Sequence, residues 1–200
     1  MAVATQSKIS YDEFLQWPGE DQHVEWVNGE IIRMSPISDR HQQIGVYLLT
    51  LIQFYTNIRG LGEVRYEPFQ MKLGANLPGR SADILFVAEA HRGRLKKTFL
   101  DGPADLVVEI ISLESRSRDR GDKFFEYEAG GVPEYWLIDP VREQAEFYQL
   151  DEKGIYRLVP LDAEGKYHSA MLPGLWLQVS WLWEMPLPPL LSILKHWELI

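Results

Sequence analysis

The apolar run at residues 105–111 (DLVVEII) constrains the fold of this chain more than any other feature. An unbroken run of Leu, Val and Ile is typical of a central strand that is covered on both faces of its sheet. A second apolar run, at residues 82–87 (ADILFV), predicts another strand. The chain therefore needs a sheet with other elements packed on both sides.

Glu109 interrupts the first of these runs. Side chains of a strand alternate between its two faces, so Val107, Glu109 and Ile111 share one face. A buried carboxylate without a partner costs several kcal/mol when it is ionised. Glu109 is therefore expected to bind a metal ion, pair with a cation or line a cleft with water. A structural ion pair with an arginine is the simplest alternative.

Asp83 likewise places a carboxylate within the second apolar run, where it shares a strand face with Leu85 and Val87. An aspartate that caps the preceding turn would explain the same position. Two inward carboxylates on apolar strands can hold a hard cation, and oxygen ligands suit Mg²⁺ or Mn²⁺. Asp83 and Glu109 are therefore the predicted metal ligands.

A helix is predicted over residues 119–129, and it carries Lys123 and Tyr127 on one face. It follows the Glu109 strand after a short loop, so its first turns can lean over the same cleft. This position makes Lys123 a candidate for the same cleft and Tyr127 a possible accessory residue. A solvated surface lysine is the alternative.

The other elements have local signals of their own. A capping box at residues 10–13 (SYDE) predicts a short helix to about residue 17, and Asn28-Gly29 predicts a hairpin. Residues 91–97 are expected to form a basic surface loop, the one place where local charge favours a phosphate backbone. Further helices are expected at about residues 38–57 and within 186–200, and further strands at 63–67, 69–73, 81–87, 134–139, 145–150 and 155–159.

This order predicts an α/β fold of the α+β type, with a central mixed sheet flanked by helices. Residues 1–200 are expected to form a single domain. Residues 160–200 would be an aromatic, proline-rich extension that packs on this domain or on a partner subunit. Because aromatic residues are enriched where subunits meet, a homodimer is expected.

Composition excludes several classes of function. The chain contains no cysteine, so disulfides, thiolate metal sites and cysteine nucleophiles are excluded. A net charge of −9 opposes broad electrostatic capture of nucleic acid, although a bound divalent metal and a local basic strip would still allow phosphate contact. No signal peptide or membrane-spanning segment is recognised, so a soluble, cytoplasmic protein is expected.

Several motifs together resemble the Uma-two family of restriction endonucleases, within the PD-(D/E)XK nuclease superfamily. The resemblance covers about residues 10–160 and implies a restriction-endonuclease-like core with an N-terminal hairpin. It also implies that Asp83 and Glu109 bind the metal and that Lys123 completes the site. It is carried by Asp83, His41, Asp122-Lys123 with Tyr127, and the segments 28–31 (NGEI), 34–36 (MSP), 106–112 (LVVEIIS), 131–136 (GVPEYW) and 138–140 (IDP).

The chain departs from the superfamily pattern at several positions. The lysine usually lies two residues after the glutamate, where this chain has Ile111, so Lys123 resembles a lysine that has migrated to the following helix. Ala82 stands where the motif has proline, and Leu113-Glu114 replace a serine-proline found in many relatives.

Glu25 and His41 are possible accessory residues, His41 as a metal ligand or a base. An exposed hairpin glutamate and a helix-terminal histidine are the simpler interpretations.

The resulting hypothesis is a Mg²⁺- or Mn²⁺-dependent endonuclease that hydrolyses nucleic acid, with DNA favoured. The cation would polarise the phosphate, and Lys123 would orient the attacking water. One alternative is a catalytically inactive nuclease-like scaffold that binds nucleic acid or a protein partner. Another is an enzyme that acts on a smaller phosphate ester.

Overall fold

The computed structural model describes residues 8–16, 24–27, 29–33, 36–74, 77–112 and 116–200. Its main sheet has six strands: β3 (Gly62–Tyr66), β6 (Ile84–Ala88), β8 (Leu106–Ile110), β9 (Glu134–Asp139), β10 (Gln144–Leu150) and β11 (Tyr156–Leu158). Their spatial order is β11-β10-β9-β8-β6-β3. β8 and β9 are parallel, and the other neighbouring strands are antiparallel. The predicted mixed sheet with a central strand at residues 106–110 is therefore confirmed.

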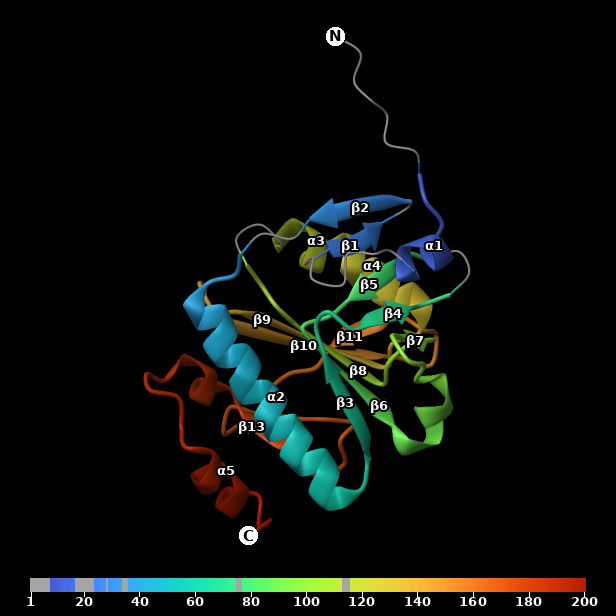
Figure 1. The fold of residues 1–200 in the computed structure, drawn as a ribbon. Coiled ribbons are helices and arrows are strands. Elements are labelled where there is room, and N and C mark those ends of the chain that lie inside the picture. Colours follow the sequence, from blue (N-terminus) through green and yellow to red (C-terminus); the bar gives the residue numbers. More distant parts are fainter. Residues whose placement is uncertain (1–7, 17–23, 28, 34–35, 75–76, 113–115) are drawn as a thin grey trace.

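The long helix α2 (Asp39–Arg59) lies across one face of this sheet (Figure 1). The Ser38 side chain caps its start by accepting a hydrogen bond from the His41 N–H, and Gly60 ends it in a left-handed conformation with φ 62°. Its buried apolar side chains recur every three or four residues, at Ile44, Leu48, Leu51, Ile52 and Tyr55. They pack against the face of the sheet that holds Phe86, Val108 and Trp136.

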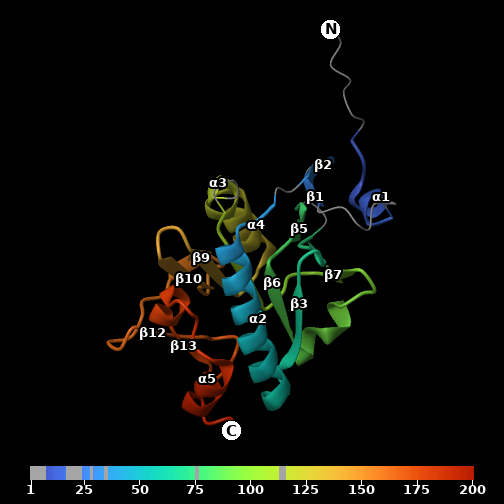
Figure 2. The same cartoon turned by 60° about the vertical axis from the view of Figure 1, so that its left-hand side comes forward.

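The C-terminal part of the chain packs on the same face, beside α2 (Figure 2). It comprises β12 (Lys166–His168), β13 (Trp176–Gln178), the 3-10 helix η2 (Val179–Trp183) and α5 (Leu190–His196). The Trp197 ring meets Tyr55 edge-on at a centroid distance of 5.4 Å, and its indole N–H donates to the Trp176 carbonyl at 2.8 Å. These tryptophans, which the sequence assigned to packing in the core or between subunits, thus make contacts within the chain.

Glu134, at the start of β9, ties this C-terminal segment to the sheet. Its carboxylate is fully buried and has no cationic partner within hydrogen-bonding distance in the described part of the chain. Each of its oxygens accepts hydrogen bonds from neutral groups instead. The donors are the Trp136 indole at 2.6 Å, the Tyr167 hydroxyl at 2.8 Å, the Ser169 hydroxyl at 3.1 Å, and the backbone N–H groups of Ala170 and Met171, both at 2.8 Å.

We expect Glu134→Ala to destabilise the protein by about 3 kcal/mol or more, because several buried donors lose their acceptor at once. For a chain of this size the melting temperature would fall by roughly 6–12 °C. Circular dichroism during heating measures this change. Glu152→Ala, at an exposed position, is the control and should leave the melting temperature almost unchanged. Equal losses in the two variants would contradict the anchoring role of Glu134.

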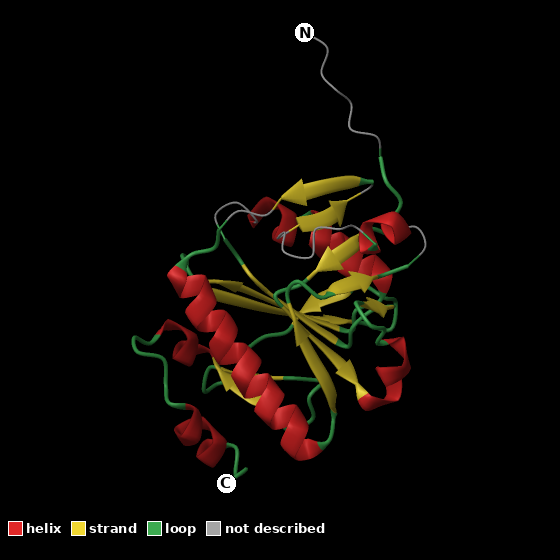
Figure 3. Cartoon of the chain, viewed as in Figure 1, coloured by secondary structure: helices red, strands yellow, loops and turns green. Residues whose placement is uncertain are grey.

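The opposite face of the main sheet is covered by α4 (Asp122–Gly130) and a three-stranded sheet of β5 (Gly79–Ser81), β4 (Gln70–Lys72) and β7 (Phe99–Asp101) (Figure 3). Tyr127 of α4, Met71 of β4 and Leu100 of β7 share an apolar cluster with Val107 and Leu85 of the main sheet. Glu109 and Val107 point to this side, as the strand alternation predicts.

The N-terminal elements lie at the end of the molecule where α2 begins (Figure 2). The capping box of α1 (Tyr11–Leu15) is present, with Ser10 and Glu13 bonded to each other's backbone. β1 (Val24–Val27) and β2 (Glu30–Arg33) pair as the predicted hairpin, and Gly29 has the expected positive φ of 92°. Asn28, Met34 and Ser35 of the quoted motifs lie outside the described residues.

The predicted strand at residues 81–87 is wrong in its continuity. β5 ends at Ser81 and belongs to the small sheet, whereas β6 begins at Ile84 and pairs with β3 and β8. Ala82 and Asp83 lie between the two strands, where the chain passes from one sheet to the other. A single apolar pattern concealed this change of partner.

Two further predictions need correction. The helix expected over residues 119–129 is two helices, α3 (Arg116–Arg120) and α4, because Gly121 adopts a non-helical φ of −115° and ψ of −96°. The expected loop at residues 91–97 overlaps the 3-10 helix η1 (Glu89–Arg94), which follows the end of β6. Since Asp83 precedes the start of β6, this basic stretch lies a strand length, roughly 17 Å, from Asp83.

β7, β12, β13 and η2 were not predicted from the sequence. Among the described residues, no helix combines the length and apolarity needed to cross a bilayer.

Candidate active site

Glu109 is buried on β8 and meets two side chains of α4. The Lys123 ammonium donates to Glu109 Oε1 at 2.9 Å, and the Tyr127 hydroxyl donates to the same oxygen at 2.6 Å. The side chains of Glu109 and Lys123 are both only 4% exposed. The i, i+4 spacing of Lys123 and Tyr127 brings both donors to one carboxylate. Oε2 of Glu109 accepts no hydrogen bond from the described residues.

Asp83 lies beside Glu109 at the entrance to β6. Ile84 pairs with Val108, and one further step along this antiparallel register sets Asp83 opposite Glu109. Asp83 Oδ2 accepts a hydrogen bond from the Ile110 N–H at 2.6 Å, and Oδ1 accepts none from the described residues. Each of the two carboxylates thus keeps one oxygen without a protein hydrogen bond.

Asp119 is a third carboxylate at this position, and the sequence interpretation did not include it as a site residue. It lies in α3, is 1% exposed, and its Oδ1 is 3.5 Å from Lys123 Nζ. The Tyr135 hydroxyl donates to its backbone carbonyl at 3.1 Å. Lys123 therefore lies between two buried carboxylates. The i, i+4 pair of Asp119 and Lys123 was the signal in the sequence, but the predicted uninterrupted helix gave it no special role.

His41 lies next to Asp83. Its position at the start of a helix did not by itself predict this contact. Its Nε2 is 3.5 Å from Asp83 Oδ2, and its side chain is 7% exposed. Burial lowers the pKa of His41, but the hydrogen bond and negative charge of Asp83, the Ile110 backbone and the charge of Glu67 together raise this pKa above its usual value. His41 is thus a partner of a predicted ligand. Glu67 is a second acidic neighbour that the sequence interpretation missed.

The orientation of α4 is fixed from its other side by a buried ion pair. Arg80 of β5 is 1% exposed, and its guanidinium bonds Glu126 of α4 through two contacts, at 2.6 and 2.8 Å. Such a two-point contact sets both position and angle. Because Glu126 lies between Lys123 and Tyr127 in sequence, Arg80 restrains the segment that delivers both donors to Glu109.

Electrostatics at Glu109 reflect burial and crowding of like charge. Burial raises the pKa of Glu109 well above its usual range. The Lys123 ammonium lowers it, Asp119 and Asp83 raise it further, and the Tyr127 hydrogen bond lowers it. Three carboxylates, those of Asp83, Glu109 and Asp119, lie here near one ammonium and one histidine.

Comparison with known proteins identifies the family of this chain. The Uma2 family, described as "Putative restriction endonuclease", matches residues 11–180. The chain belongs to the Uma2 family. The matched segment contains Asp83, Glu109, Asp119 and Lys123. Uma2 membership makes the chain part of a nuclease family.

Two other proteins are similar to this Uma2 chain. A solved structure of a "putative nuclease belonging to DUF820" from Anabaena variabilis ATCC 29413 superposes with a TM-score of 0.72 at 18% identity, covering 88% of this chain and 97% of that one. "Uncharacterized protein slr1290" from Synechocystis sp. is 26% identical over 162 residues, covering 80% of this chain and 83% of the relative. The first likeness shows that the two chains share a fold.

The site of this Uma2 protein thus unites five predicted or suspected residues: Asp83, Glu109, Lys123, Tyr127 and His41. The backbone of Glu25 lies in β1, but its side chain is outside the described residues. The described residues contain no group of three or more His, Cys, Asp or Glu side chains arranged to hold a metal ion. A cation here would therefore keep several water ligands.

The raised pKa of Glu109 gives a pH-dependent prediction for the metal-free protein. The pKa of Glu109 is higher in the folded protein than in the unfolded chain, where it is about 4.3. The free energy of unfolding therefore falls as pH rises from the unfolded pKa through the folded pKa, because Glu109 must then ionise while buried. Glu109→Gln should therefore melt progressively higher than the wild type as pH increases, by a few degrees. Melting curves in chelator at several pH values measure this, and Glu152→Gln is the control. A constant difference at all pH values would contradict the prediction.

Proposed function

We propose that this protein is a metal-dependent endonuclease that hydrolyses phosphodiester bonds of nucleic acid, with DNA as the favoured substrate. The observation that carries the proposal is the pair Asp83 and Glu109, which the register of β6 and β8 brings close together beside the buried Lys123. Each carboxylate has one oxygen that accepts no hydrogen bond from the described residues. Membership of a nuclease family supports the same chemistry.

The donor set fits Mg²⁺ or Mn²⁺ better than other cations. Only carboxylate oxygens are offered, and Mg²⁺ is commonly held by one or two carboxylates together with waters and substrate phosphate. Asp83 and Glu109 would hold the ion through the oxygens that bind no protein donor. When bound, it would supply Lewis-acid stabilisation of the negative charge that develops on the phosphate.

The protein groups have separate roles in this proposal. Lys123 places a positive charge next to Glu109, where it orients a nearby water or offsets negative charge on a phosphate oxygen. Tyr127 holds Glu109 Oε1, which directs the other oxygen away from α4. His41 and the Ile110 N–H hold Asp83 in the same way.

A local excess of positive charge supports a phosphate-rich substrate despite the net charge of −9. The segment leading into the site has four basic residues and two acidic ones: Arg116, Arg118, Arg120 and Lys123 against Asp119 and Asp122. Arg120 is already bonded to Glu146 at 2.5 Å. α3 is thus the proposed contact with the nucleic-acid backbone, in place of the more distant residues 91–97.

The proposal includes a homodimeric, cytoplasmic protein. A symmetric dimer provides two sites, one for each strand of a duplex.

We expect the purified chain to nick or linearise plasmid DNA with Mg²⁺ or Mn²⁺, and Asp83→Ala or Glu109→Ala to reduce the rate at least about 100-fold. Calorimetric titration with Mn²⁺ should show weaker binding in both variants. Asp122→Ala is the matched control, because Asp122 is exposed next to Lys123 but has no contact with Glu109 among the described bonds.

Several outcomes would reject this function. Absence of cleavage of DNA and RNA together with unchanged Mn²⁺ affinity in Asp83→Ala and Glu109→Ala would remove both substrate and metal. Metal binding without cleavage would favour the nuclease-like scaffold. Hydrolysis of a small phosphodiester but not of nucleic acid would favour an enzyme acting on smaller phosphate esters.

Lys123→Ala tests the migrated lysine by itself. We expect kcat to fall by roughly 100- to 1,000-fold, because a preorganised positive charge at the reacting phosphate is lost. Mn²⁺ affinity should not fall, since Lys123 repels the cation. Lys97→Ala, at an exposed lysine distant from the site, should cleave like the wild type. A variant that loses metal binding but retains kcat would contradict the assigned role.

A further inference from the structure

The exposed side of α2 has no charged residues along most of its length. Arg40 and Arg59 bracket residues 41–58, which contain no Asp, Glu, Lys or Arg. The buried side of this stretch packs on the sheet, but a second stripe at a spacing of four residues faces outward. Within this stripe Val46, Phe54 and Ile58 are 58%, 44% and 49% exposed, and Thr50 completes the spacing. This arrangement gives α2 two apolar faces, whereas a surface helix needs only one.

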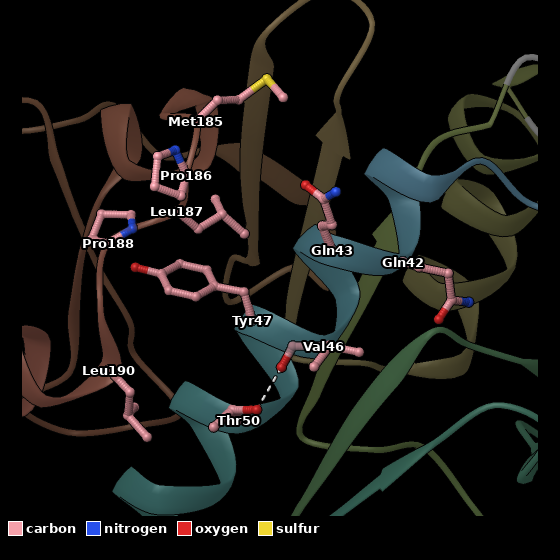
Figure 4. A pocket seen from close by; sticks show the side chains of 10 residues that line it. All are labelled: Gln42, Gln43, Val46, Tyr47, Thr50, Met185, Pro186, Leu187, Pro188 and Leu190. Atoms are coloured by element: carbon pink, nitrogen blue, oxygen red, sulfur yellow. Dashed lines mark hydrogen bonds between the residues drawn. The ribbon is translucent and has the colours of Figure 1, made fainter.

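A groove lies beside this stripe, between α2 and the segment that leads into α5 (Figure 4). Its cavity volume is about 960 Å³. In Figure 4 the Tyr47 ring extends from α2 toward Leu187 and Pro188 on the opposite wall. None of the lining residues is charged: they are Gln42, Gln43, Val46, Tyr47, Thr50, Met185, Pro186, Leu187, Pro188 and Leu190.

A protruding apolar side chain lines the same groove. This residue is Met185, which is 78% exposed; Leu191, which follows the lining residue Leu190 in α5, is also exposed, at 65%. The same surface thus has both a groove and exposed apolar side chains that can fill a groove of this kind. A two-fold symmetric contact needs this property, because the same patch must serve both partners.

Charge favours a second copy of this chain as the occupant. Each copy carries a net charge of −9, so most pairs of surfaces would bring like charges together. The stripe at 46, 50, 54 and 58 and the groove together form the α2 surface. Two copies can approach through this surface without bringing like charges together. The lining of the groove offers a basic partner no carboxylate, and Glu184 beside it lies outside the lining. Depletion of charge with enrichment in Met and aromatic residues is also typical of an interface core.

The dimensions are adequate for a stable contact. Eighteen helical residues, 41–58, extend about 27 Å. A standard interface buries about 800 Å² on each partner, which is a patch roughly 28 Å across. The helix together with the 185–191 segment beside it covers an area of this order.

We infer that two copies of the chain associate through the α2 surface, with α2 of one copy packed against α2 and the groove of the other. This inference rests on the homodimer part of the proposed function and names its contact surface. It does not depend on catalysis. The His41 end of α2 lies in the candidate active site, so such a dimer would connect the two sites through one pair of helices.

The test is sedimentation equilibrium of the full chain over a range of concentrations. We expect the wild type to form dimers, and Val46→Glu and Leu191→Glu to weaken the dimer by at least about tenfold in Kd, or about 1.4 kcal/mol. Val141→Glu is the matched control, because Val141 is also an exposed valine, at 66%, but lies in the turn between β9 and β10 and belongs neither to the stripe nor to the lining of the groove. Unchanged melting temperatures would show that the variants fold.

A second measurement uses the absence of cysteine from the chain. A single cysteine introduced in turn at positions 46, 50, 54 and 58 should form a disulfide-linked dimer under mild oxidation in at least one variant, because a two-fold axis through the stripe brings a position close to its own copy. Val141→Cys should remain monomeric in denaturing gels.

A wild type that stays monomeric at all concentrations would overturn the inference and leave the face to a different partner. Equal weakening by Val141→Glu, or no cross-link at any stripe position, would also overturn it. Loss of DNA cleavage in a protein that still dimerises would count against the proposed catalysis alone.

Discussion

The burial of the Glu109 carboxylate is the constraint on which the rest of the site depends. A negative charge cannot remain on a covered central strand without donors, so α4 must dock with Lys123 and Tyr127 directed at it. Arg80 then fixes the same helix through Glu126 from the small sheet. The small sheet, α4 and the main sheet are thus held in one arrangement by two buried polar contacts.

Glu134 shows how the same residue type serves a different purpose. Both glutamates are buried on the adjacent parallel strands β8 and β9. Both oxygens of Glu134 are occupied by neutral donors, which makes it a structural anchor. Glu109 has both donors on one oxygen and lies among other carboxylates, which leaves a surplus of negative charge. Hydrogen-bond saturation, and not burial, distinguishes the structural carboxylate of Glu134 from the candidate site carboxylate of Glu109.

Charge is distributed unevenly over the molecule. The acidic total of −9 is interrupted by a basic segment at α3 beside the site and by an uncharged surface along α2. These two regions are where nucleic acid and a second copy of the chain are proposed to bind. α2 connects them, because His41 in its first turn contacts Asp83 while its outward stripe continues to Ile58.

The sequence by itself determined most helices and strands and the face on which Glu109 lies, because these follow from local periodicity, capping residues and turns. It also offered Asp83, Lys123 and Tyr127 as candidate site residues, and the choice of Lys123 depended mostly on the family resemblance. Only the tertiary structure decided that the chain changes sheets at Ala82 and Asp83, that Asp119 lies at the site, and that His41, which the sequence offered as a possible accessory residue, contacts Asp83. These features depend on pairing between strands far apart in the chain, such as β4 with β7 and β6 with β8. A local sequence pattern does not reveal which distant strand a segment pairs with.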